Sequence, residues 1–127
     1  MSPHALIIDD DVNNLDVLAQ LLQQQHVTST LVKDPTKVME IVIKLPDLDV
    51  IFCDLEMPKI DGYALLRSLR TIVDKHVQII CVSVHVSELT RSHKLGFDGF
   101  IGKPLDGTTF PSQLERILSG QSVWELP

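Results

Sequence analysis

The chain has 127 residues, of which 44% are hydrophobic and 22% are charged, so it can bury a core without disulfides or a structural metal. Its 17 acidic residues outnumber its 11 basic residues, and the basic residues are scattered singly, which argues against direct binding of nucleic acid. No apolar run exceeds four residues and the first four residues do not resemble a signal peptide, so we expect no membrane insertion and a cytoplasmic location.

The first half of the chain alternates between strand-like and helical patterns. Residues 5–8 and 50–53 are continuous apolar runs, which are typical of strands covered on both faces of a parallel sheet. The weaker run at 27–32 suits an edge strand. Apolar residues recur at helical spacing over 12–22 and 38–45, which predicts an amphipathic helix in each of these connections.

The second half continues the alternation. A third helical pattern covers 65–73, and the apolar run at 79–82 predicts another buried strand. The helical stretch 87–95 has few apolar residues, so we expect thin packing and mobility there. Residues 99–101 suit a second edge strand, and 109–119 predict the last helix.

Five strands alternating with five helices predict an α/β fold with a doubly wound, five-stranded parallel sheet. We expect one domain over 1–127, with a core at about 5–119 and a loosely held tail at 120–127. The two cysteines, Cys53 and Cys81, lie inside strand-like runs, so we expect buried, reduced thiols rather than a disulfide or a zinc site.

Polar side chains stand where the predicted strands end, which is the edge at which such sheets bind ligands. Asp9 and Asp10 end the first strand, Asp54 the third and Ser83 the fourth, while the fifth runs into Lys103. Carboxylates a few ångströms apart repel by roughly 4 kcal/mol per close pair at an effective dielectric constant near 20, so a cation should neutralise them. Oxygen donors without a Cys and His cluster favour Mg²⁺ (or Mn²⁺) over zinc.

Asp54 is the best-placed nucleophile, because it follows an apolar strand directly and precedes a loop that exposes its side chain. Such a carboxylate can form an acyl phosphate. Ser83 could donate a hydrogen bond to one phosphoryl oxygen, and Lys103 could pair with another. Asp11 is as well explained as a helix cap as by a role in this site.

Taken together, these residues resemble the receiver domain of two-component response regulators over about residues 5–118. The resemblance rests on Leu6-Ile7-Ile8-Asp9-Asp10-Asp11, on Asp54-Leu55-Glu56-Met57-Pro58 with Asp61-Gly62, on Ser83, and on Gly96-Phe97-Asp98-Gly99-Phe100-Ile101-Gly102-Lys103-Pro104.

The resemblance implies that Asp54 accepts a phosphoryl group from a histidine kinase or a phosphotransfer protein. It also implies that Asp9, Asp10, Asp54 and the backbone carbonyl of Glu56 bind Mg²⁺. The strand order would be 2-1-3-4-5, with a cis bond before Pro104. Such a domain is no enzyme apart from Mg²⁺-dependent self-phosphorylation and autodephosphorylation at Asp54.

The resemblance further implies a coupled switch, in which Ser83 moves toward the phosphoryl group and Phe100 turns inward to fill the vacated space. The physical basis is a bistable element biased by new charge-assisted hydrogen bonds. The helix at 87–95, the strand at 99–101 and the helix at 109–119 would then form the face that binds a downstream protein target.

One residue beside the site departs from the family pattern, and two others are expected to affect the rate of dephosphorylation. Val84 stands where the family usually has alanine, and we expect it to narrow access and slow phosphoryl exchange with small donors or water. Glu56 and His85 are expected to border the path of the attacking water and to tune dephosphorylation, with the sign left open.

Two other interpretations compete. A phosphatase of the haloacid dehalogenase type would need a second aspartate two residues after the nucleophile, where this chain has Glu56, and an acidic pair after the nucleophile strand. A receiver that has lost phosphorylation would serve only as an interaction module, with Val84 as its best support. The sequence leaves open the cognate kinase, the output target, the oligomeric state, the phosphorylation lifetime, and whether the domain acts alone or in a longer protein.

Overall fold

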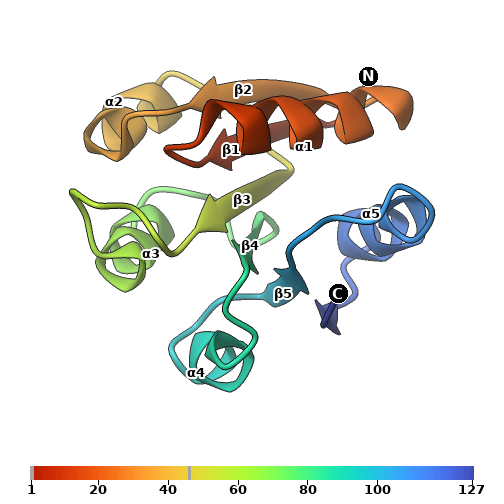
Figure 1. Ribbon diagram of the computed structural model, residues 1–127. Coiled ribbons are helices and arrows are strands. Elements are labelled where there is room, and N and C mark those ends of the chain that lie inside the picture. The colour runs from red at the N-terminus through yellow and green to blue at the C-terminus, as the bar shows by residue number, and fades with distance from the viewer. Residues whose placement is uncertain (1, 46) are drawn as a thin grey trace.

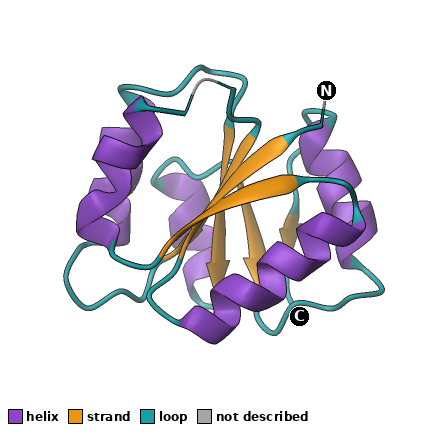
Figure 2. Ribbon diagram, turned by 90° about the horizontal axis from the view of Figure 1, so that it is seen from above, coloured by secondary structure: helices purple, strands orange, loops and turns teal. Residues whose placement is uncertain are grey.

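The computed structural model describes residues 2–45 and 47–127. One parallel sheet runs through these residues in the order β2-β1-β3-β4-β5-β6, with helices on both of its faces (Figure 1). The view from above shows the twisted sheet between its two layers of helices (Figure 2). The strands are β1 (His4–Ile8), β2 (Thr28–Val32), β3 (Val50–Asp54), β4 (Gln78–Ser83), β5 (Gly99–Gly102) and β6 (Trp124–Glu125).

The helices begin close to where the sequence predicts them. They are α1 (Val12–Gln24), α2 (Val38–Ile43), α3 (Gly62–Arg70), α4 (Glu88–Lys94) and α5 (Phe110–Leu118), and a short 3-10 turn at Pro35–Lys37 precedes α2. The side chains of Asp11, Asp34 and Asp61 accept hydrogen bonds from backbone N–H groups at the starts of α1, the 3-10 turn and α3. These caps satisfy N–H groups that have no partner within the helix.

Two apolar cores lie on opposite faces of the sheet. On one face, α1 and α5 bury residues such as Leu18 and Leu114 against Phe52. On the other face, α2 and α3 bury residues such as Val42 and Leu66. The expected α/β fold with a doubly wound parallel sheet is therefore confirmed, and so is the order of its first five strands.

The tail expected at 120–127 contains a short strand that the sequence does not predict. Residues Trp124–Glu125 form a sixth strand, and Val123 before them is buried. For the same reason β5 is not an edge strand, since β6 pairs with it in parallel on the side away from β4. A strand of two residues is too short to show the alternation by which strands are found in a sequence.

Helix α4 is thinly packed, as its composition predicts. Ser92 is its one fully buried residue, and Leu95 just beyond it is 44% exposed. None of the helices in residues 2–45 and 47–127 is both long and apolar enough to span a lipid bilayer.

Candidate functional site

The register of the parallel sheet brings the polar strand ends together. Ile8 pairs with Cys53, so Asp9 and Asp54 follow at the same level of neighbouring strands. Ser83 pairs with Gly102 in the same way, which places Lys103 immediately beyond it. Because all these strands point in one direction, their carboxyl ends form a single edge.

Three carboxylates meet at this edge, and we call Asp9, Asp10 and Asp54 the acidic rim. One carboxylate oxygen from each of them lies within 4.8 Å of the others. Asp9 and Asp54 are only 4% and 5% exposed, and Asp10 is half-buried. Oxygen donors at this spacing suit a divalent cation such as Mg²⁺, which usually retains some of its water.

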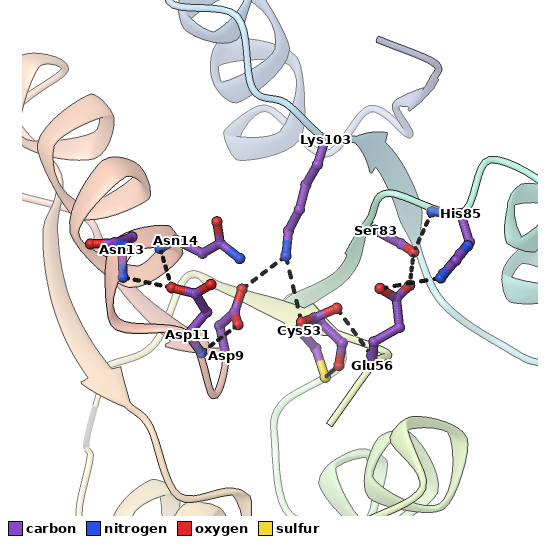
Figure 3. A network of polar contacts seen from close by, with 10 residues as sticks. Asp9, Asp11, Asn13, Asn14, Cys53, Glu56, Ser83, His85 and Lys103 are labelled. Atoms are coloured by element: carbon purple, nitrogen blue, oxygen red, sulfur yellow. Dashed lines mark hydrogen bonds and ion pairs between the residues drawn. The ribbon is translucent and has the colours of Figure 1, made fainter. Parts of the chain in front are cut away.

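Lys103 reaches from the end of β5 into the acidic rim (Figure 3). Its Nζ donates a hydrogen bond to Asp9 Oδ2 at 2.9 Å and lies 3.5 Å from Asp54 Oδ2. Its side chain is 12% exposed, so the ion pairs are largely screened from water. One cation against three carboxylates leaves a local surplus of negative charge, and burial makes that surplus costly.

The ionisation of the rim reflects this surplus. Burial raises the pKa of Asp54 to about 6, and the nearby charges of Asp9 and Glu56 add to the rise, whereas the Glu56 N–H and Lys103 oppose it. Burial alone would lower the pKa of Lys103, but its hydrogen bond to Asp9 and the charge of Asp54 raise it instead. Lys103 therefore stays protonated at neutral pH, and Asp54 loses its proton less readily than an ordinary aspartate.

Ser83 is fully buried, and its hydroxyl is held in a small network beside the rim (Figure 3). Ser83 Oγ donates a hydrogen bond to Glu56 Oε1 at 2.5 Å and accepts one from the backbone N–H of His85 at 3.0 Å. Glu56 Oε2 lies 3.5 Å from Nε2 of His85. The hydroxyl would have to leave Glu56 before it could donate to a phosphoryl oxygen, because it carries one proton.

The remaining residues singled out in the sequence lie at this edge or within the strands that lead to it. The side chain of Val84 is 53% exposed, whereas Phe100 on β5 is fully buried. Asp11 is the N-cap of α1. The Lys103–Pro104 peptide bond is cis, as the resemblance implies. Cys53 and Cys81 are buried free thiols.

Sequence reasoning did not identify an apolar cavity of about 170 Å³ beside the rim. Asn14, Val17 and Leu105 line it together with Asp54 and Lys103. No motif marks these residues, since they come from α1 and from the loop after β5 and meet only in the folded chain. The cavity therefore places mostly apolar side chains beside Asp54.

Comparison with known proteins identifies the family. The family model for the response regulator receiver domain matches residues 5–115. The chain is 35% identical over 105 residues to stress response regulator protein 1 of Scheffersomyces stipitis, covering 79% of this chain and 36% of that protein. It is 28% identical over 120 residues to the two-component response regulator ORR11 of Oryza sativa subsp. japonica, covering 92% of this chain and 79% of that protein.

Solved structures agree with this assignment. A CheY-like response regulator receiver domain from Methylobacillus flagellatus superposes with a TM-score of 0.81 at 25% identity, covering 92% of this chain and 99% of that one. The signal receiver domain of a histidine kinase from Syntrophus aciditrophicus gives a TM-score of 0.79 at 27% identity, covering 94% of this chain and 92% of that one. The chain spans about a third of the length of stress response regulator protein 1. Because the family model matches residues 5–115, this chain belongs to the response regulator receiver domains of two-component systems.

Proposed function

We propose that Asp54 is the phosphoacceptor of this receiver domain. The observation that carries the proposal is the placement of Asp54 at the end of a buried strand, within the acidic rim and 3.5 Å from the ammonium group of Lys103. Receiver domains are signalling modules that are generally not enzymes, so the reaction would modify the domain itself once per signal.

The proposed phosphoryl donor is a phosphohistidine of a histidine kinase or of a phosphotransfer protein. A carboxylate oxygen of Asp54 attacks the phosphorus atom, the P–O bond forms, and the P–N bond breaks. The electron pair of the broken bond stays on the imidazole nitrogen, which leaves with the donor protein. Lys103 pairs with a phosphoryl oxygen as negative charge gathers beside Asp54.

Receiver domains typically bind Mg²⁺ at an acidic cluster, and the acidic rim fits that ion because its surplus charge needs a cation. Asp9, Asp10, Asp54 and the backbone carbonyl of Glu56 would hold it. When bound, Mg²⁺ (or Mn²⁺) would neutralise the rim and orient phosphoryl oxygens.

We further propose that the hydroxyl of Ser83 leaves Glu56 and donates to the phosphoryl group. Phe100 would then adjust in the core below, and the face formed by α4, β5 and α5 would change its affinity for a downstream protein. This coupling is supported by the thin packing of α4. The lifetime of the phosphorylated state would be adjusted by three residues beside the acidic rim, namely Glu56, Val84 and His85. A cytoplasmic location follows from the proposed kinase partner.

The test is phosphoryl labelling with radioactive acetyl phosphate in the presence of Mg²⁺. We expect one phosphoryl group per chain, loss of labelling in Asp54→Asn, and loss on chelation of Mg²⁺. Asp16→Asn on the exposed face of α1 is the matched control and should label like the wild type. Labelling that persists in Asp54→Asn would overturn the assignment.

Two further measurements separate the competing interpretations. Sustained turnover of a generic phosphate ester would support a phosphatase of the haloacid dehalogenase type. An absence of labelling, with no shift of the amide resonances of Ser83 and Phe100 on addition of beryllofluoride and Mg²⁺, would support an interaction module without phosphorylation.

A further inference from the structure

The last residues of the chain lie on the face to which the proposed function assigns the downstream target. Residues 123–127, which we call the C-terminal strap, run along β5 between α4 and α5 (Figure 1). Trp124 pairs with Phe100 and Glu125 with Ile101 in a parallel register. The N–H of Phe100 donates to the carbonyl of Val123 at 2.7 Å. The strap thus takes up hydrogen-bonding groups that an edge strand would otherwise present.

The strap uses specific side-chain contacts on both neighbouring helices. The ring of Trp124 stacks on His93 of α4, with centroids 4.0 Å apart and an interplanar angle of 17°. Glu125 accepts hydrogen bonds from Arg116 of α5 at 2.6 and 3.1 Å and from Gln113 at 2.9 Å. An aromatic group and an acidic group are therefore recognised at adjacent positions of an extended segment.

The surface of β5 is shaped for close approach of a backbone. A Cβ atom at Gly99 would lie 2.7 Å from the carbonyl oxygen of Val123, and one at Gly102 would overlap the ring of Pro127. These two glycines leave room that side chains would close.

The strap is held less firmly than the other strands. Val123 is its one buried residue, Trp124 and Glu125 are half-buried, and Leu126 is 56% exposed. The ion pair of Arg116 and Glu125 is more than a third exposed on both sides, so water and salt weaken it. A short segment with few buried contacts opens more easily than the sheet it covers.

We propose that the C-terminal strap is an internal, displaceable occupant of this face, and that the partner of the face is a protein that inserts an extended segment beside β5. That segment would present an aromatic residue to His93 and, at the next position, an acidic residue to Arg116 and Gln113. Addition of a strand to a sheet edge is a common mode of peptide recognition. That the inserting protein is the downstream target rests on the proposed function. The strap and the surface that holds it do not depend on that proposal.

Peptide binding to the 127-residue chain tests this inference without a phosphoryl donor or metal. The probe is a fluorescein-labelled peptide with the sequence of residues 121–127, followed by fluorescence anisotropy. In the wild type the tethered strap competes with the peptide at a high effective concentration. In the double variant Trp124→Ala/Glu125→Ala the strap should leave the face more often. The peptide should then bind at least about tenfold more tightly than it binds the wild type, because the state with an unoccupied face is more populated.

Controls keep the result specific. Glu115 is an exposed acidic residue of α5, and within residues 2–45 and 47–127 the strap's polar side-chain contacts on α5 are to Gln113 and Arg116, so Glu115→Ala should bind the peptide like the wild type. Peptides with alanine at the aromatic or the acidic position should bind the double variant clearly more weakly. Glu125→Ala alone provides a milder release if the double variant does not fold.

Hydrogen exchange at the amide of Phe100 reports directly on strap release, since this N–H donates to Val123. We expect faster exchange in the double variant than in the wild type or in Glu115→Ala. Unchanged exchange would show that these side chains do not hold the strap, and faster exchange without tighter peptide binding would show that the face does not recognise this chemistry. Either result overturns the inference, and neither depends on phosphorylation of Asp54.

Discussion

The acidic rim and the contact between the C-terminal strap and α5 both place a carboxylate beside a cation, yet their electrostatics differ. In the rim, burial raises the pKa of Asp54 to about 6 even though Lys103 is close. At the strap, hydrogen bonds from Arg116 and then Gln113 lower the pKa of Glu125. The rim has three carboxylates for one lysine, whereas Glu125 is matched by Arg116. A surplus of buried negative charge favours a further cation, which is the role that we propose for the rim, whereas a balanced, half-exposed pair favours a contact that holds structure.

Removal of the basic side chain should give the largest difference in stability between the two regions. Lys103→Met would leave the buried carboxylates of Asp9 and Asp54 without their cationic partner, and we expect the free energy of unfolding to fall by about 3 kcal/mol. Arg116→Met at the strap should lower the free energy of unfolding clearly less, because the ion pair of Arg116 and Glu125 is solvated. Urea unfolding at pH 7.5 with a chelator measures both values. Equal losses would show that the rim is no more strained than the strap contact.

The pH dependence of stability tests the sign of the Asp54 shift. The pKa of Asp54 is about 6 in the folded chain, above its ordinary value of 3.8, so the folded state binds the proton more tightly. Ionised Asp54 therefore opposes folding above pH 6, and its contribution becomes more favourable as the pH falls from 7 toward 4. Without metal at pH 7.5, Asp54→Asn should be about 2 kcal/mol more stable than the wild type, and the gap should narrow by pH 5.

Glu125→Gln is the counterpart of that experiment at the strap. Because the pKa of Glu125 is lowered in the folded chain, its ionised form favours folding at neutral pH. The glutamine variant should thus be less stable than the wild type at pH 7.5, opposite in sign to Asp54→Asn. A change of the same sign at both positions would contradict the contrast between the regions.

Metal affinity sharpens the comparison further. Asp10→Asn removes one negative charge from the rim. We expect the Mg²⁺ affinity, measured by titration calorimetry, to weaken about tenfold, which corresponds to about 1.4 kcal/mol. The same measurement on Glu125→Gln should give the affinity of the wild type, since this residue lies outside the rim. A weaker Mg²⁺ affinity in Glu125→Gln would place the cation elsewhere.

The smallest effect is expected at the border of the pocket. Val84 is 53% exposed, so Val84→Ala should leave the free energy of unfolding nearly unchanged. The rate of labelling by acetyl phosphate, or the rate of dephosphorylation, should rise by about threefold. Such a change corresponds to less than about 1 kcal/mol in barrier height. The two rates are followed by radioactive labelling and by its decay. Unchanged values for both would refute the proposal that Val84 narrows access.

Much of the fold and of the candidate site could be predicted, because the relevant signals are local. The apolar runs that became β1, β3 and β4 are buried on both faces, and continuous apolar sequence is typical of such strands. Asp9, Asp54 and Ser83 each follow or end one of them. Parallel strands share one carboxyl edge, so the meeting of these residues follows from the strand pattern once the sheet is parallel.

The contacts that depend on the exact placement of distant side chains could not be predicted. Nothing in the spacing of Glu56 and Ser83 indicates that the hydroxyl donates to this glutamate at 2.5 Å. The apolar cavity beside Asp54 likewise arises where α1 meets the loop after β5. Both features depend on how separate elements pack, and sequence periodicity carries no information about that packing.

The sequence by itself determined the alternating strands and helices and the polar residues at the strand ends, because hydrophobic periodicity and chain direction act over a few residues. Only the tertiary structure decided that residues Trp124–Glu125 form a strand, since two residues have no periodicity and their order comes from β5, His93 and Arg116. It also decided the ionisation of Asp54, because the pKa of a carboxylate depends on burial and on charges brought near it by folding.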